Sequence, residues 1–151
     1  MHMTVIKINI IDNYTGDKYV PSIDKISKWA ELCLCSNYDS VIVNLMLVGL
    51  AESQKFNINF RSKPGPTNVL SFPYEDNTSL QGDLVMCSPL VIKEAANLKK
   101  TEESHWIHLF VHGMLHLQGY DHQNDEEEKE MTSLEDSIIA EIVNKEQGAK
   151  A

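Results

Sequence analysis

Residues 112–122 read HGMLHLQGYDH and carry His112, His116 and His122 within one short segment. This spacing is typical of zinc-binding helices in metallopeptidases, where the residue after the first histidine is a glutamate that acts as general base. Here that residue is Gly113. The stretch therefore predicts a metal site that lacks the peptidase base.

The stretch ends a segment, residues 102–118, that we expect to form a buried central helix. Between His105 and Tyr120 there is no Asp, Glu, Lys or Arg, and apolar side chains cover most of the circumference. At about 100° per residue, four histidines fall within an arc of about 80°. These residues are His105, His108, His112 and His116. Their imidazoles are therefore predicted to share one face of the helix.

The spacing of the histidines favours a catalytic zinc site. His112 and His116 are one helical turn apart, so both rings can reach one ion at the roughly 2.0–2.1 Å typical of zinc. Gly119 can adopt the left-handed conformation that ends a helix, which would return His122 as a third ligand. Three protein ligands leave a fourth position for water, so we expect one Zn²⁺ per chain.

Three further residues are weaker candidates, each with a structural alternative. His108 could extend the ligand set, support it by a hydrogen bond, or be a packed core histidine. Asp121 could orient a ligand histidine, relay a proton, or only shape the turn. Asp83 follows Gly82 and is either a carboxylate in a turn or a group that would hydrogen-bond to a metal-binding residue.

Length and composition predict one globular domain over residues 1–151. With 42% apolar and 23% charged residues, the chain can bury a core without disulfides, and three cysteines favour reduced thiols. Met1 and His2 precede Met3 and are interpreted as an expression scar, so His2 is not a candidate ligand. No apolar run approaches the roughly 20 residues of a membrane span, and a secretion signal is lacking. We therefore expect a cytoplasmic protein with no membrane partner.

Periodicity along the chain predicts an α+β fold. Strands are expected at 4–10, 41–48, 68–72 and 82–87. Helices are expected from about Pro21, at 50–57, from a Ser88 cap to about Lys99, at 102–118 and at 125–145. This order indicates a small mixed sheet packed with about four to five helices.

The charge balance argues against nonspecific binding of nucleic acid over most of the protein surface. The formal net charge is −9, whereas nonspecific affinity for nucleic acids comes largely from lysine and arginine. Four of the 22 acidic residues lie in one block, Asp125–Glu128, near the C-terminus, so a local basic cleft elsewhere is compatible with the net charge. Arg61 is the single arginine among 13 basic residues.

Three motifs together resemble the YbeY family of zinc-dependent endoribonucleases. They are HGMLHLQGYDH at 112–122, FRSKPGPTNVLSFP at 60–73 and QGDLV at 81–85. The resemblance implies one α+β domain, one zinc, and cleavage of single-stranded RNA during ribosomal RNA maturation and ribosome quality control. It further implies action on the 3′ end of the small-subunit RNA. A mild departure is QGDL at 81–84, where the family motif reads LGDI.

The same resemblance implies roles for individual residues. His112, His116 and His122 match the metal ligands of the family motif, and Arg61 matches its cleft arginine. A phosphodiester does not require a carboxylate at the position of Gly113, because its transition state chiefly needs charge stabilisation and an aligned nucleophile. We therefore expect zinc and the planar guanidinium of Arg61 to bracket the scissile phosphate.

Two other classes of protein fit parts of the pattern. Another zinc hydrolase, such as a metallopeptidase, would use the same histidines but needs a base elsewhere in the chain. A noncatalytic factor that binds RNA or the ribosome through a structural zinc needs a fourth protein ligand, for which His108 is the nearest candidate. The coordination number of the metal separates these hypotheses.

Overall fold

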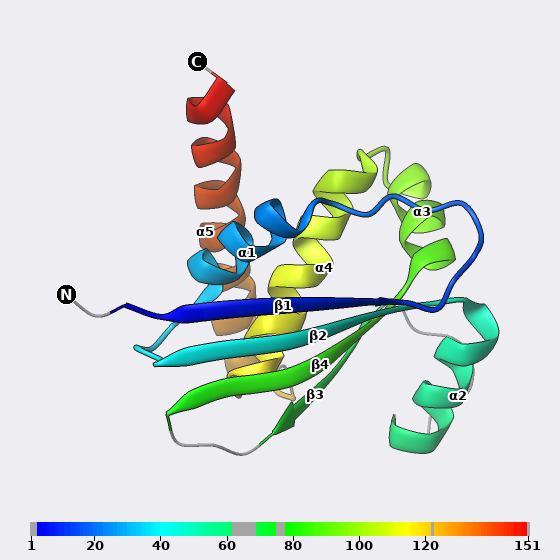
Figure 1. Ribbon diagram of the computed structural model, residues 1–151, viewed down its shortest axis with the longest axis horizontal. Helices are drawn as coiled ribbons and strands as arrows, with labels where there is room; N and C mark the ends of the chain where they lie inside the picture. The colour runs from blue at the N-terminus through cyan, green and yellow to red at the C-terminus, as the bar shows by residue number, and fades with distance from the viewer. Residues whose placement is uncertain (1–2, 62–68, 75–77, 122, 151) are drawn as a thin grey trace.

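The computed structural model describes residues 3–61, 69–74, 78–121 and 123–150. It contains a four-stranded sheet with helices on both sides (Figure 1). The strands are β1 (Val5–Asp12), β2 (Ser40–Val48), β3 (Val69–Tyr74) and β4 (Ser79–Cys87). The helices are α1 (Ile23–Cys33), α2 (Leu50–Arg61), α3 (Ser88–Asn97), α4 (Glu102–Leu117) and α5 (Asp125–Lys150). The predicted α+β class is confirmed.

The sheet is mixed and has the strand order β1-β2-β4-β3. β2 pairs in parallel with both β1 and β4, whereas β3 runs antiparallel to β4. The parallel strands need long connections, and α1 supplies the connection between β1 and β2. The central strand β2 reads SVIVNLMLV, and such an apolar run is typical of a strand covered on both faces.

The two faces of the sheet are covered by different helices. One face of β2 lies in the main core, and its residues are Val41, Val43, Leu45 and Leu47. On the other face, Val48 and Met46 pack with Val85 of β4 and Phe56 of α2. Because successive side chains of a strand point to opposite faces, α2 covers one face and the other four helices lie on the opposite one (Figure 1).

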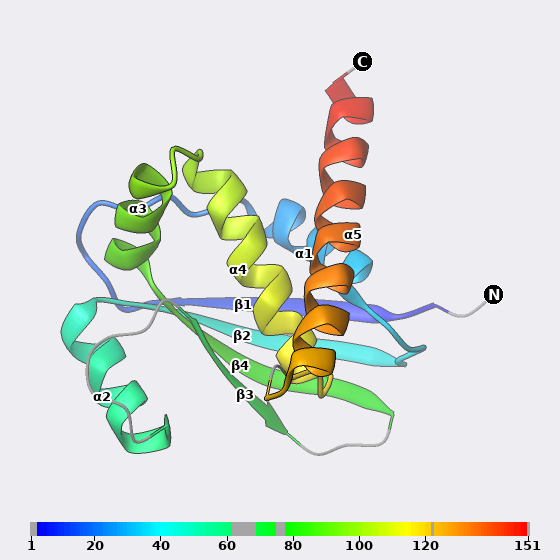
Figure 2. The same cartoon turned by 180° about the vertical axis from the view of Figure 1, so that it is seen from behind.

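Helix α4 occupies the middle of the helical layer, between α3 and α5 (Figure 2). Phe110 is fully buried, and its ring centroid lies 6.3 Å from that of Trp29 on α1 and 6.5 Å from that of Trp106. The apolar circumference seen in the sequence is therefore covered by the sheet and by neighbouring helices. This arrangement fixes the direction in which the polar face of α4 points.

Several boundaries differ from the prediction. Helix α2 continues through Arg61 rather than ending near residue 57, and β4 begins at Ser79, where it meets Ser40 of β2. Ser88 is the first residue of α3, and Cys87 precedes it without a side-chain cap hydrogen bond, so the predicted Ser88 cap is wrong. Pro89 does lie in the first turn, where its missing N–H costs nothing.

None of the helices in the described part of the chain is long and apolar enough to cross a lipid bilayer.

Candidate metal centre on helix α4

The start of α4 is fixed by a local cap and by contacts to α1. The Thr101 side chain accepts a hydrogen bond from the Ser104 backbone N–H at 3.0 Å. Glu102 and Glu103 lie in the first turn, where their negative charge interacts favourably with the partial positive charge of the helix N-terminus. Glu103 also pairs with Lys25 of α1 at 2.5 Å. These contacts hold the helix that carries the histidines against its neighbour.

The end of α4 is formed by a left-handed glycine, as the sequence predicted. Gly119 has φ +98°, and its N–H donates to the His116 carbonyl at 3.0 Å, while Tyr120 N–H donates to the Leu115 carbonyl at 3.1 Å. This pair of bonds is the Schellman arrangement that closes helices. The chain therefore turns at Gln118 and Gly119, just beyond the last helical turn, and leads to Asp121, which is partly buried.

Gln118 links the last turn of α4 to the end of α1. Its Nε2 donates to the Cys33 carbonyl at 2.8 Å, and its Oε1 accepts from the Cys35 backbone N–H at 2.8 Å. Both partners lie more than 80 residues away in the sequence, so sequence reasoning missed this contact. The link restrains the turn that carries His116.

His112 and His116 present their ε nitrogens to one another. The two Nε2 atoms are 3.0 Å apart, and the rings lie edge to face with centroids 4.5 Å apart. The side chain of His112 is 28% exposed, so this pair lies at the margin of the core rather than within it. His112 and His116 therefore share one face of α4, as predicted, and the ring nitrogens that could bind a metal lie next to each other.

Glu135 of α5 lies behind this pair and was not among the predicted site residues. Its Oε1 is 2.5 Å from Nδ1 of His112, and its Oε2 is 3.3 Å from Nε2 of His108. Burial acts to raise the pKa of Glu135, but hydrogen bonds from His108 and His112 outweigh burial and lower the pKa to about 2. Glu135 is therefore an ionised carboxylate at neutral pH.

The contact with Glu135 determines where His112 carries its proton. An ionised carboxylate can only accept hydrogen bonds, so Nδ1 of His112 must be the donor. In a neutral imidazole the other nitrogen then carries no proton, and in His112 this is Nε2, the atom that faces His116. His108 belongs to this carboxylate contact and is not directed at the pair of Nε2 atoms.

The donor set fits a zinc ion as far as the described residues extend. Two nitrogens bound tetrahedrally at roughly 2.0–2.1 Å from one zinc lie about 3.3 Å apart, close to the 3.0 Å between the Nε2 atoms of His112 and His116. His122, the third predicted ligand, lies outside the described residues. Within the residues that the structure describes, no three His, Cys, Asp or Glu side chains form a metal-holding group. The complete ligand set stays a prediction.

The backbone of Arg61 is described, whereas its side chain is not. Arg61 is the last residue of α2, the helix that packs on the sheet face opposite to α4. Its predicted contact with substrate therefore stays a prediction. The same holds for the proposed roles of Asp121 beyond its place after the turn.

Asp83 is separated from the histidines by the sheet. It lies within β4 on the same side as Val85, away from Leu84 and the main core. Its Oδ1 accepts from Nδ2 of Asn44 at 3.0 Å, and Asn44 in turn accepts from Asn9 at 2.9 Å. The carboxylate thus extends a polar row across three strands. The prediction that it lies in a turn or supports the metal ligands does not agree with this position.

His105 provides an internal contrast on the same helix. Its side chain is 5% exposed, and its Nε2 lies 2.9 Å from Oε1 of Glu94 on α3. This imidazole and carboxylate join α4 to α3, one turn or more away from the His112 and His116 pair. His105 is a structural residue by this geometry.

Comparison with known proteins gives consistent matches over nearly the whole chain. The family model described as Endoribonuclease YbeY matches residues 10–143. The Endoribonuclease YbeY of Buchnera aphidicola subsp. Acyrthosiphon pisum is 40% identical over 141 residues, which cover 91% of each protein. The solution structure of TM1509 from Thermotoga maritima matches with a TM-score of 0.59 and 28% identity, covering 95% of this chain and 93% of that one.

Proposed function

We propose a function from the premise that this chain belongs to the Endoribonuclease YbeY family. The chain is a nuclease that hydrolyses phosphodiester bonds in single-stranded RNA. Its substrate is ribosomal RNA of the small subunit, at the 3′ end, and it acts in ribosomal RNA maturation and ribosome quality control. The catalytic centre is a zinc site held by His112, His116 and His122.

The observation that carries this proposal is the pair of facing ε nitrogens. A carboxylate fixes the proton of His112 at Nδ1, which leaves its Nε2 lone pair 3.0 Å from Nε2 of His116. The two rings face each other near the end of a helix that Gly119 closes, and His122 follows Gly119 by three residues in the sequence.

The zinc site and Arg61 would have different roles in cleavage of the phosphodiester bond. A bound zinc ion would supply a water of lowered pKa or polarise a phosphoryl oxygen. Arg61 would contact two oxygens of the scissile phosphate with its planar guanidinium and neutralise the charge that develops there. His112 and His116 would hold the ion through their facing ε nitrogens, and Gly119 ends the helix that carries them.

The metallopeptidase alternative has no carboxylate at the position that its motif uses for the base. Gly113 occupies the position of the peptidase glutamate and is buried. The carboxylate nearest to the histidine pair among the described contacts is Glu135, but it lies against Nδ1 of His112, the edge of the ring opposite to Nε2. It therefore cannot reach a water on the Nε2 side.

The alternative of a closed structural zinc is also less well supported. It requires a fourth protein ligand, and Nε2 of His108 is directed instead at Oε2 of Glu135, at 3.3 Å. An open fourth position is the arrangement used in catalytic zinc sites. A count of bound ligand atoms by zinc X-ray absorption would distinguish the two.

The decisive experiment measures cleavage of a precursor small-subunit ribosomal RNA fragment together with bound zinc. Wild type, His112→Ala and Arg61→Ala are purified in parallel, and Lys28→Ala serves as a control that removes one positive charge from the exposed surface of α1. We expect His112→Ala to lose both zinc and cleavage. Arg61→Ala should keep zinc and lose about 10²-fold or more in cleavage rate, because a charge-stabilising donor is removed.

The control and the contrary outcomes are distinct. Lys28→Ala should cut at nearly the rate of wild type. Equal cleavage by all four proteins would identify a contaminating nuclease, and an unchanged rate in Arg61→Ala alone would remove the arginine from the mechanism. If wild type held zinc but none of the proteins cut RNA, the noncatalytic factor would become the better interpretation.

A further inference from the structure

Glu135 occupies a position in α5 where the sequence pattern calls for an apolar residue. Its neighbours on the buried face of α5 are 1–7% exposed. They are Met131, Ile138 and Ile142. Glu135 itself is 8% exposed. Burying a carboxylate costs desolvation free energy unless the group is paired and hydrogen-bonded. A leucine at this position would pack in the interface without that cost.

Both oxygens of this carboxylate are used by imidazoles of α4. Oε1 lies 2.5 Å from Nδ1 of His112 and Oε2 lies 3.3 Å from Nε2 of His108. Because His108 and His112 are four residues apart, their rings stand one turn apart on the same helix face, and a single carboxylate spans them. Glu135 thus restrains two neighbouring rings at once, which a single hydrogen bond to the backbone would not do.

The restraint on His112 has a direct consequence for its other nitrogen. A neutral histidine can carry its proton on either nitrogen, and the hydrogen bond made by one nitrogen decides which of them is free to bind a metal. Metal-binding histidines commonly donate their second N–H to a carboxylate, which orients the ring and raises its basicity. The contact between His112 and Glu135 has this form.

We propose that Glu135 is a positioning residue for the metal centre, which holds His112 with Nε2 toward His116 and keeps His108 out of the ligand set. This inference rests on the proposed function of the histidine pair. Glu135 does not touch the reacting atoms; it acts through His112. Removing it frees the His112 ring and its proton, so metal affinity falls even though every ligand remains.

The test compares zinc affinity in wild type, Glu135→Gln and Glu135→Ala. Each affinity is measured by competition with a chromophoric chelator. Glutamine has nearly the shape of glutamate but loses the charge that serves both imidazoles, so we expect zinc binding about 10-fold weaker for Glu135→Gln and about 100-fold weaker for Glu135→Ala. Glu94→Gln is the matched control, because it changes the carboxylate beside His105 on the same helix. It should leave zinc affinity unchanged.

A second measurement separates positioning from packing. Histidine tautomers are read from ¹⁵N NMR spectra of the metal-free proteins. His112 should carry its proton on Nδ1 in wild type and in Glu94→Gln, and should lose this preference in Glu135→Gln and Glu135→Ala. Thermal unfolding checks that each variant is folded, and Glu135→Gln decides the matter if the alanine variant is not.

Failure of this inference and failure of the proposed function give different results. If Glu135→Gln bound zinc as tightly as wild type and kept the Nδ1 tautomer of His112, Glu135 would be a packing residue and the nuclease proposal would stand. If wild type bound no zinc and cut no RNA, the proposed function would fail, and this inference would fall with it.

Discussion

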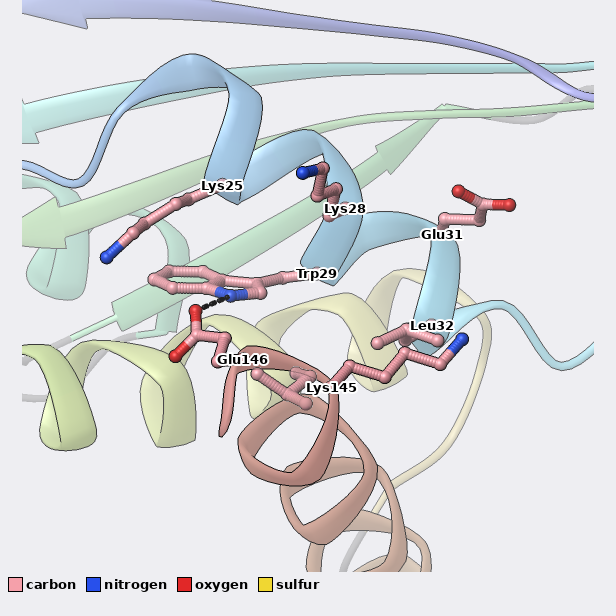
Figure 3. A pocket seen from close by; sticks show the side chains of 8 residues that line it. Lys25, Lys28, Trp29, Glu31, Leu32, Lys145 and Glu146 are labelled. Atoms are coloured by element: carbon pink, nitrogen blue, oxygen red, sulfur yellow. Dashed lines mark hydrogen bonds between the residues drawn. The ribbon is translucent and has the colours of Figure 1, made fainter. Parts of the chain in front are cut away.

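Two carboxylates of α5 each hold a ring nitrogen of a neighbouring helix, and they lie in different regions of the molecule. Glu135 is 2.5 Å from Nδ1 of His112 on α4, and Glu146 accepts from Nε1 of Trp29 on α1 at 3.0 Å (Figure 3). The two positions are 146 − 135 = 11 residues apart, which at about 100° per residue places them within about 20° on one face of α5. One face of α5 therefore makes the same kind of contact twice, a hydrogen bond between a carboxylate and a ring nitrogen of another helix.

The difference lies in the ring that is held. An indole has a single nitrogen, so the bond from Trp29 to Glu146 satisfies the ring and ends there. Around it the charges are also paired, Lys25 with Glu103 and Lys145 with Glu141. An imidazole has a second nitrogen, and the bond to Glu135 leaves that atom of His112 without a proton. The contact of Trp29 serves stability, whereas in the proposed metal centre the contact of His112 also orients a ligand.

The largest effect that would sharpen this comparison is expected from His116→Ala. This variant removes one of the two facing nitrogens without changing either α5 contact. RNA cleavage should fall to background, and addition of zinc at 100 times the wild-type Kd should no longer provide the stabilisation of about 2.7 kcal/mol that mass action predicts for wild type. Thermal unfolding with and without a chelator measures this difference. Equal stabilisation of the variant by zinc would mean that His116 is not a ligand.

A smaller effect, confined to stability, is expected from Trp29→Ala. The side chain is 2% exposed and packs against Phe110, so its loss should reduce the free energy of unfolding by about 3–5 kcal/mol. Zinc affinity of the folded protein should not change. Trp29→Phe is the partial control, because it keeps one aromatic ring but loses the N–H donor and part of the buried volume, so its cost should lie between about 1 kcal/mol for the hydrogen bond and the cost of Trp29→Ala. Urea unfolding combined with a zinc titration would contradict the comparison if zinc affinity fell in either variant.

The smallest effect is expected from Glu146→Gln. The amide oxygen can still accept from Trp29, so the free energy of unfolding should fall by about 1 kcal/mol or less, with no change in zinc affinity or RNA cleavage. Glu135→Gln is the same substitution on the same face of the same helix and is expected to weaken zinc binding. If the two variants behaved alike in the zinc titration, the distinction between the two regions would not hold.

The predictions that succeeded depended on short stretches of sequence. The run from His105 to Tyr120 lacks charged residues, and this property alone indicated a buried helix with its histidines on one face. Gly119 was expected to end that helix in a left-handed conformation, and it does. Both results follow from the fixed period of the helix and from the conformational freedom of glycine.

The residue that sequence reasoning missed was Glu135. It lies 23 residues beyond His112, in a helix whose buried face also carries Met131, Ile138 and Ile142. The signal that could have found it is an acidic residue at core spacing between apolar ones. Its partner could not be named, because the angle at which α4 and α5 cross decides which side chains meet.

The position of Asp83 shows the same limit in the sheet. The motif around Gly82 suggested a turn or a site carboxylate, but Asp83 lies within β4 and on the face away from α4. In a strand the face of a side chain depends on register, and a shift by one residue reverses it. Pairing with β2 sets that register, and Asn44 of β2 becomes the partner of Asp83.

By itself the sequence determined the features that arise within one element: the α+β class, the helix at 102–117, the shared face of His112 and His116, and the glycine turn that follows. Tertiary structure alone decided that a carboxylate of α5 holds His112 and that the sheet separates Asp83 from it. The reason is physical. Helical period and glycine conformation act over a few residues, whereas the environment of a ring nitrogen depends on how distant segments pack.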